Sequence, residues 1–454
     1  MDALRTAPGA AANGPAAPAE TGPGPGRGST RPSPNLTLSH LVEQRRAAGE
    51  PLVNLTFGEA RLPLLPELAQ QLAAGAHRAS YGPVAGAEDA RGAVAGYFGR
   101  RGLPTDPADI VLAPGSKPLL MALNLAADGD VLLPRPAWNT YAPQVRYAGR
   151  EPLAVPVPDV CGGVPDPGAL RAAIGRARAA GRTPRVLLLT LPDNPTGTLA
   201  PPDLVRELVA VAEAEDLLII SDEIYRDVVH DPATPFLSPA EAAPERTVVT
   251  TGLSKSLGIG GWRVGAARFP AGPRGRAVRD GVVTAASEIW STLAGPLQQV
   301  AAYAFAEPEP VRARMAAAAR LHGAVARAVH ARATAAGALC RPPTAGFYVY
   351  PDFEPLRAPL ARRGITDSAS LAAGLLDRGG VAVLAGHLLG DDPAALRFKA
   401  ATSLLYGDSR QQLSALRAED PTALPHIAEQ LTRIEEAFAR LTEGPGPRPA
   451  RRPS

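Results

Sequence analysis

The stretch Gly252-Leu-Ser-Lys255-Ser-Leu-Gly-Ile-Gly-Gly-Trp-Arg263-Val-Gly265 follows a predicted strand and combines a lysine, a glycine-rich turn and an arginine. Arginine stays protonated in proteins, whereas a lysine amine can lose its proton and act as a nucleophile. A GC-rich genome also depletes lysine, so the neighbourhood of each lysine decides whether a site needs an amine. Only three of the 47 lysines and arginines in this 454-residue chain are lysines, namely Lys117, Lys255 and Lys399.

Short β-rich runs alternate with longer Ala/Leu/Arg stretches of helical period around this lysine. Such alternation predicts βαβ units and an α/β fold with a mainly parallel sheet flanked by helices. Ligands of such sheets bind at the carboxyl ends of the strands. The predicted strands are Ile110–Ala113, Asp130–Leu133, Arg185–Leu191, Leu217–Ser221, Thr247–Thr251 and Arg263–Phe269, and the helices between them include Lys117–Ala127, Gly168–Ala180 and Pro202–Glu215.

After about residue 300 the pattern predicts a second, smaller α+β domain. It consists of a long helical region (Val311–Ala336), short strands at Phe347–Tyr350, Val381–Leu384 and Leu396–Ala401, and a final helix at Pro425–Leu441. The expected organisation is a Pro/Gly/Ala-rich disordered tail (1–34), a segment packing with the small domain (35–65), a large domain (66–309), the small domain (310–443) and a second disordered tail (444–454).

Composition limits the classes of partner. The net charge is +3 without a dense basic block, so we expect no nucleic-acid arm. No apolar run approaches the roughly 20 residues of a membrane helix, so no membrane partner is expected. Two cysteines, Cys161 and Cys340, cannot form a disulfide framework, which favours a reducing cytoplasm.

Polar residues follow neighbouring strands of the predicted sheet. Asp222 stands just beyond one buried strand, and Asn194 lies in the proline-ringed turn Pro192-Asp-Asn194-Pro-Thr-Gly197 after another. Lys255 follows the next strand, 33 residues after Asp222, so adjacent strands bring both residues to one rim of the sheet. An aspartate at this place is able to bind a metal, cap a helix or hold a protonated ring nitrogen.

The segment Ala-Pro114-Gly115-Ser116-Lys117-Pro118 joins a strand to a helix. Ser116 is expected to cap the helix, whose first backbone N–H groups form an anion site. Lys117 and Arg263 would add charge for a phosphate. Together the strand ends supply an amine, a carboxylate for a pyridinium nitrogen, donors for a phenolate oxygen and a phosphate cradle, which pyridoxal 5′-phosphate requires.

The chain resembles the fold-type I pyridoxal-phosphate enzymes of the aspartate aminotransferase superfamily, class I/II, from about Asn54 to Ser403. The resemblance implies a seven-stranded sheet of the pyridoxal-phosphate-dependent transferase type and a homodimer with shared sites. It also implies that Lys255 is the catalytic lysine, which forms a Schiff base with the cofactor. The implied cofactor-binding residues are Tyr81, Gly115, Ser116, Lys117, Trp138, Asn194, Asp222, Tyr225, Ser254 and Arg263.

The roles of these residues follow from the resemblance. Asp222 would pair with the pyridine nitrogen, Tyr225 and Asn194 would bond the phenolic oxygen, and Trp138 would stack on the ring. The phosphate would be held by Arg263, Ser254, the Gly115–Lys117 backbone and Tyr81, the last of these reaching into a neighbouring subunit. The substrate α-carboxylate would be held by Arg397 and the backbone of Gly58.

The implied activity is transfer of an amino group from an L-amino acid to a 2-oxo acid by a ping-pong mechanism. A pyridoxal-phosphate lyase, decarboxylase or synthase of the same fold is the open alternative. The substrate stays open, because the segment after Gly386 reads His-Leu-Leu-Gly-Asp-Asp where relatives have Pro-Gly-x-x-Phe, and residues 404–424 form an insertion. Lys399 alternates with Arg397 along a strand, so both side chains are expected on one face. A surface or rim lysine is the favoured interpretation, and a place in the substrate pocket stays open.

Other enzyme classes lack their sequence signals. No Gly-x-Gly-x-x-Gly follows a first strand, and no Gly-Lys dipeptide is present for a phosphate-binding P-loop, which disfavours a nucleotide-binding dehydrogenase. The seven histidines form no His-Glu-x-x-His, so no metal site is expected. A transcription regulator would need a basic helical domain ahead of the fold, and only the Pro/Gly-rich tail stands there.

Overall fold

The computed structural model describes residues 34–442, and a seven-stranded sheet in the order β2-β8-β7-β6-β5-β3-β4 forms its centre. The pairs β7–β6, β6–β5, β5–β3 and β3–β4 are parallel, and β8 runs antiparallel to both of its neighbours. The predicted α/β class with a mainly parallel sheet is therefore confirmed. The strands are β2 (Ile110–Ala113), β3 (Asp130–Arg135), β4 (Pro152–Pro156), β5 (Pro184–Thr190), β6 (Leu218–Asp222), β7 (Thr247–Gly252) and β8 (Gly265–Arg268).

The sequence pattern does not predict β4. Proline stands at both ends of this strand, at Pro152 and Pro156. Proline has no backbone N–H to donate to a neighbouring strand, so it is found mainly at strand starts and in edge strands. The strand lies at the edge of the sheet beside β3, where a proline costs little.

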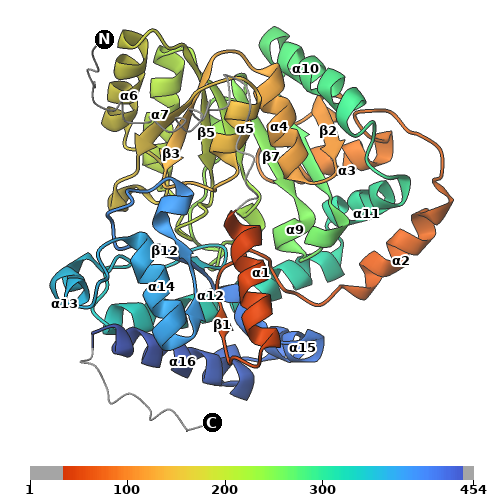
Figure 1. Cartoon of the computed structure of the whole chain (residues 1–454). Helices are drawn as coiled ribbons and strands as arrows, with labels where there is room; N and C mark the ends of the chain where they lie inside the picture. Colours follow the sequence, from red (N-terminus) through yellow and green to blue (C-terminus); the bar gives the residue numbers. More distant parts are fainter. Residues whose placement is uncertain (1–33, 443–454) are drawn as a thin grey trace, which may run out of the picture.

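The central strands are apolar on both faces because helices cover both faces. On β5, Val186 and Leu188 pack with helices α4, α5 and α10, whereas Leu187 and Leu189 pack with α6 and α7. This alternation of neighbouring residues is the period of a strand. Figure 1 shows the sheet between its helices. The bounds of these helices are α4 (Ser116–Ala126), α5 (Tyr141–Tyr147), α6 (Pro167–Ala179), α7 (Pro202–Ala214) and α10 (Pro273–Ile289).

A further group of helices completes this part of the molecule. Helices α3 and α11 pack closely on each other, and their apolar residues form one cluster with β2 and β8. In the part of the chain that the structure describes, no helix combines the length and apolar character needed to cross a membrane. The group comprises α2 (Pro66–Ala74), α3 (Glu88–Gly99), α8 (Pro239–Ala242), α9 (Leu253–Ser256) and α11 (Gly295–Ala306).

The smaller part of the fold contains two short sheets, one with the order β11-β12-β9 and one in which β1 pairs with β10. The blue C-terminal elements and the red α1 and β1 gather in the lower half of Figure 1. Its strands are β1 (Val53–Asn54), β9 (Tyr348–Val349), β10 (Val381–Ala382), β11 (Leu384–Ala385) and β12 (Phe398–Ala401), and its helices are α1 (Pro34–Ala47), α12 (Glu309–Ala335), α13 (Arg357–Ala361), α14 (Ser368–Gly379), α15 (Ser409–Arg417) and α16 (Pro425–Thr442).

The predicted single strand Val381–Leu384 is wrong, because the chain changes sheets within it. Val381 and Ala382 pair in parallel with β1, whereas Leu384 and Ala385 pair in antiparallel with β12. Both short strands are buried, so an unbroken apolar run conceals the change of partner.

The insertion at residues 404–424 forms helix α15 and short 3₁₀ turns. Helix α15 begins with a capping box in which Asp408 accepts from the backbone N–H groups of Arg410 and Gln411. It packs against α12. The insertion therefore extends the hydrophobic core of the smaller part through Ala415.

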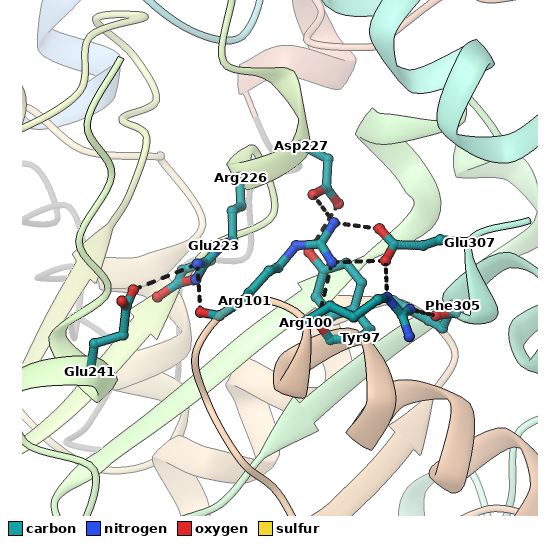
Figure 2. Close-up of polar contacts among 9 residues, drawn as sticks. All are labelled: Tyr97, Arg100, Arg101, Glu223, Arg226, Asp227, Glu241, Phe305 and Glu307. Atoms are coloured by element: carbon teal, nitrogen blue, oxygen red, sulfur yellow. Dashed lines mark hydrogen bonds and ion pairs between the residues drawn. The ribbon is translucent and has the colours of Figure 1, made fainter. Parts of the chain in front are cut away.

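A network of buried and half-buried charges holds the segment that follows β6 (Figure 2). The Asp227 carboxylate accepts from the Tyr97 hydroxyl at 2.9 Å and from Arg101 at 2.7 Å. Arg101 also pairs with Glu307, which ties the segment to the end of α11. On the other side of Tyr225, the buried Glu223 carboxylate accepts from Arg226 at 2.8 Å and from the hydroxyls of Ser221 and Ser238.

We predict that Arg101→Met lowers the free energy of unfolding by about 3 kcal/mol, because it leaves the largely buried Asp227 carboxylate without a cation and leaves Glu307 with Arg100 alone. Chemical denaturation at neutral pH measures this change. The matched control is Arg433→Met on an exposed helical pair with Glu429, which is expected to cost about 0.5 kcal/mol or less. Equal effects in the two variants would show that the network does not support the fold.

Candidate active site

Three parallel strands end side by side at the centre of this site. Thr190, Asp222 and Thr250 are paired in register across β5, β6 and β7, and all three are buried. Asn194, Tyr225 and Lys255 follow these ends within a few residues. The register therefore brings the polar residues predicted from three separate motifs to one edge of the sheet.

Asp222 is a buried carboxylate with neutral hydrogen-bond donors on both oxygens. Its Oδ2 accepts from the Tyr141 hydroxyl at 2.8 Å, and its Oδ1 accepts from the Thr250 hydroxyl at 3.1 Å. Burial raises the pKa of Asp222 to about 6, although these two hydrogen bonds oppose the rise. Each carboxylate oxygen retains a further acceptor site, so the group is able to receive a charged N–H donor.

Lys255 lies in the short helix α9 and is half-buried. Its Nζ donates to the backbone oxygen of Gly58 at 2.5 Å. Burial lowers the pKa of the Lys255 amine to about 8, and the positive charges of Arg263 and Lys117 act in the same direction. Glu59 and Asp222 partly oppose this effect. A lysine in this environment becomes a neutral nucleophile far more readily than an exposed lysine.

Two tyrosine hydroxyls and an asparagine amide meet beside the lysine. Asn194 Nδ2 donates to the Tyr225 hydroxyl at 3.4 Å, and the Tyr225 and Tyr348 hydroxyls lie 2.6 Å apart. Within the described residues, the buried Oδ1 of Asn194 has no hydrogen-bond partner. Tyr348 stands in a predicted strand, but its role is not predictable from the sequence, because one strand tyrosine among several gives no distinct signal.

An anion cradle lies at the start of α4. Gly115 has a positive φ of 90°, and a Cβ there would stand 2.4 Å from the Arg263 guanidinium, so the backbone turn requires glycine. Gly115 itself is the N-cap and Ser116 is the first helical residue, so the predicted Ser116 cap is wrong. Among residues 34–442, neither Lys117 nor Arg263 forms an ion pair with a carboxylate. Ser254 lies half-buried beside Lys255.

Trp138 lies beside the anion cradle. Its ring centroid is 5.2 Å from that of Tyr141 in an edge-on arrangement, and Lys117 Nζ lies 5.1 Å from the Trp138 ring. Trp138 therefore connects the anion cradle to the Tyr141–Asp222 hydrogen bond. A cavity of about 1460 Å³ lies beside it, lined by apolar residues of α1, α5, α14 and the turn after β11.

Gly58 and Arg397 are the residues predicted to bind the substrate, and Tyr81 is the residue predicted to reach a neighbouring subunit. The three lie in different surroundings. Gly58 lies against Tyr348, whose hydroxyl would be 2.1 Å from a Cβ at position 58. Arg397 is half-exposed, and its guanidinium pairs with Asp352 at 2.8 Å and Asp391 at 3.5 Å. Tyr81 is 92% exposed and contacts none of the other site residues by a described bond.

Lys399 is not the surface or rim lysine that the sequence suggested. It is 1% exposed, and its Nζ lies 5.0 Å from the centroid of the Tyr348 ring. Arg397 lies just before β12, and alternation along the strand does not show which neighbours cover Lys399. The strand is buried on all four of its residues.

The residues present fit the cofactor that the resemblance implies. The Gly115 turn, Lys117 and Arg263 provide an anion cradle whose charges have no carboxylate partner among the described residues. The Asn194 amide and the Tyr225 hydroxyl provide donors for a phenolate oxygen, and Asp222 provides an acceptor for a ring N–H. Within residues 34–442 no group of three or more His, Cys, Asp or Glu side chains is arranged to hold a metal ion.

Comparison with known proteins agrees with this geometry. The family model described as aminotransferase class I and II matches residues 50–404. The chain is 32% identical over 372 residues to an aspartate/prephenate aminotransferase of Thermus thermophilus (78% of this chain and 88% of that protein). It is 30% identical over 389 residues to an aspartate aminotransferase of Geobacillus stearothermophilus (83% of this chain and 93% of that protein).

A solved structure shows the same fold. The aspartate aminotransferase from Thermus thermophilus with maleate superposes with a TM-score of 0.74 at 27% identity, covering 90% of this chain and 97% of that one. The family match spans the strand ends, the lysine stretch and β12, and thus every site residue named above. The chain therefore belongs to the class I and II aminotransferases.

Proposed function

We propose that this aminotransferase uses pyridoxal 5′-phosphate to move the amino group of an L-amino acid to a 2-oxo acid. The observation that carries the proposal is the convergence of Lys255, Asp222, Asn194 and Tyr225 at one sheet edge beside the anion cradle. A lyase, decarboxylase or synthase would use the same fold, but the matching relatives are named as aminotransferases.

The side chains have distinct roles in this proposal. Lys255 would hold the cofactor through its amine, and Arg263, Lys117, Ser254 and the backbone of Gly115 and Ser116 would bind its phosphate. When bound, pyridoxal phosphate supplies an electron sink for negative charge at the substrate α-carbon. Asp222, when ionised, keeps a proton on the ring nitrogen, and its hydrogen bonds from Tyr141 and Thr250 help it to ionise.

The Lys255 amine is also the base in this proposal. With the cofactor bound, the Lys255 amine would take a proton from the substrate α-carbon and return it to the carbon of the cofactor that receives the amino group. Its lowered pKa makes the neutral amine available near physiological pH. Trp138 would stack on the ring, and Asn194 and Tyr225 would donate to the phenolic oxygen.

A homodimer with shared sites is part of the proposal. The exposure of Tyr81 supports it, because an aromatic side chain that is 92% exposed is available to a second copy of the chain. A cytoplasmic location also remains a prediction, based on the two cysteines, which are both free. Dicarboxylic amino acids are the first donors to test, because the matching relatives are named aspartate aminotransferases.

Ping-pong kinetics are the expected result for transamination, because the first product leaves before the second substrate binds. Initial rates measured against donor concentration at several fixed acceptor concentrations should give parallel double-reciprocal lines. Intersecting lines would contradict the proposal. A product formed without any 2-oxo acid acceptor would instead support the lyase or decarboxylase alternative.

We predict that Lys255→Arg abolishes both transamination and the visible absorbance of the bound cofactor, because arginine keeps the charge but lacks a nucleophilic amine. Absorbance spectroscopy of the purified protein with added pyridoxal phosphate tests the second effect without relying on activity. Lys117→Arg is the matched control, and it should weaken cofactor binding at most while the absorbance is retained. Visible absorbance in Lys255→Arg equal to that of the unmodified protein would defeat the assignment.

Lys255→Met should stabilise the cofactor-free protein at pH 7 by on the order of 2 kcal/mol, because burial lowers the pKa of the amine from 10.5 to about 8. Between these values the unfolded chain binds more protons, so the penalty is full below pH 8 and disappears as the pH approaches 10.5. Denaturation of both proteins at pH 7 and at pH 10 measures the difference. If the added stability of Lys255→Met is as large at pH 10 as at pH 7, burial does not lower the pKa of Lys255.

A further inference from the structure

Near its start, the insertion at residues 404–424 contains a tyrosine that reaches a histidine in the core of the smaller part. Tyr406 is fully buried and ends the 3₁₀ turn Thr402–Tyr406. Its hydroxyl lies 2.7 Å from Nδ1 of His322, which belongs to α12 and is also fully buried. The two ring centroids lie 5.6 Å apart. The insertion is thus joined to α12 by a hydrogen bond as well as by ring packing.

The same turn and the same histidine hold Phe347 from two directions. The ring centroid of His322 is 4.9 Å from that of Phe347. The backbone oxygen of Phe347 accepts from the N–H of Thr402 at 2.9 Å and from its hydroxyl at 3.1 Å. Thr402 is the first residue of the turn that ends at Tyr406. The side chain and the backbone of Phe347 are therefore both fixed by this part of the fold.

Phe347 lies directly against two groups of the candidate site. Its ring packs edge-on against that of Tyr225, with the centroids 5.9 Å apart. The Lys255 Nζ is 5.9 Å from the centroid of Phe347 and 6.0 Å from that of Tyr225. Edge-on packing depends on the orientation of both rings, so the position of Phe347 constrains that of Tyr225. A continuous series of contacts thus runs from the insertion to the reacting amine through Tyr406, His322, Phe347 and Tyr225.

Stability alone does not account for this polar pair. Burial lowers the pKa of His322 to about 3, so the ring is neutral and acts by packing and hydrogen bonding. Among residues 34–442 the buried Nε2 of His322 has no hydrogen-bond partner, which is costly in an apolar core. Replacement of a buried hydrogen-bonded pair by apolar groups of the same shape is often neutral or stabilising. The pair is therefore better explained by the geometry that it imposes on Phe347.

We propose that Tyr406 and His322 are positioning residues, which hold Phe347 against Tyr225 and the Lys255 amine. This inference rests on the proposed function, in which Tyr225 donates to the phenolic oxygen of the cofactor. Both residues act through Phe347. The first turn of the insertion thereby has a task in the active site, in addition to its share of the hydrophobic core.

The test follows the visible absorbance of the protein loaded with pyridoxal phosphate while the pH is varied. Tyr406→Phe removes one oxygen atom and breaks the hydrogen bond with His322. A displaced Tyr225 donates less well to the phenolic oxygen, which then keeps more negative charge beside the Lys255 nitrogen and holds its proton more tightly. We expect the pH midpoint of the absorbance change to rise by about 0.5 to 1 unit, because one neutral hydrogen bond is partly lost. The kcat/KM for the amino-acid donor should fall roughly 3- to 10-fold.

Two further variants separate positioning from general stability. His322→Leu removes both the hydrogen bond and the ring, so it should raise the midpoint at least as much as Tyr406→Phe. The matched control is Phe438→Leu on α16, because Phe438 packs with Phe353 and Phe398 in the same core. It should lower the free energy of unfolding, measured by chemical denaturation, and leave the midpoint within about 0.2 units of that of the unmodified enzyme.

Either of two results overturns the proposal. If Tyr406→Phe and His322→Leu lose stability but keep the midpoint and the kcat/KM of the unmodified enzyme, the pair serves the core alone. If Phe438→Leu raises the midpoint as much as His322→Leu does, the shift reflects a loosened core. The midpoint does not depend on turnover, so an unmodified enzyme that binds the cofactor without transaminating defeats the proposed function and still tests the positioning role.

Discussion

The register of three parallel strands is the constraint on which the site depends. Because Thr190, Asp222 and Thr250 are neighbours across β5, β6 and β7, the Thr250 hydroxyl donates to the Asp222 carboxylate, and the Thr190 hydroxyl bonds the Tyr141 hydroxyl that also donates to it. The same register sets the starting points of the turns that carry Asn194, Tyr225 and Lys255. A slip of one residue in any strand would turn its side chains to the opposite face of the sheet. Apolar packing on both faces, with Leu187 and Leu188 buried in different clusters, opposes such a slip.

Burial shifts the two central ionisable groups toward their neutral forms. Lys255 becomes easier to deprotonate, and Asp222 becomes harder to ionise. The shift at Lys255 favours its proposed role, because a nucleophile must be neutral, whereas the shift at Asp222 opposes its proposed role, because a carboxylate that holds a ring N–H must be charged. At Asp222 the hydroxyls of Tyr141 and Thr250 oppose the rise in pKa, and at Lys255 the charges of Glu59 and Asp222 partly oppose the fall. The ion pairs of Arg101 with Asp227 and of Arg226 with Glu223 hold the chain on both sides of Tyr225.

Most of the large sheet could be predicted from the sequence, because its strands are apolar runs that end at polar turns. The site residues on those turns could be predicted for the same reason, since strand order brings them together. The edge strand β4 could not be predicted, because its prolines are typical of turns as well as of edge strands. The division of residues 381–385 between two sheets and the burial of Lys399 depend on which strands pack together across the chain. Of the two acids on Arg397, Asp391 lies six residues before it and Asp352 lies 45 residues before it, and spacing along one strand contains no information about either contact.

The change of sheets at Val383 has a mechanical consequence. Leu55 donates its N–H to Ala382 and accepts from Ala401, and the Ser403 hydroxyl donates to the backbone of Glu59. These hydrogen bonds join the loop that carries Gly58 to the strand that carries Lys399, although the two segments are far apart in the sequence. Lys255 belongs to the other side of the pocket, on α9. Any hinge movement between the two sides would change the distance between the amines of Lys255 and Lys399. It would leave the distance between Gly58 and Lys399 unchanged, because both belong to the same side.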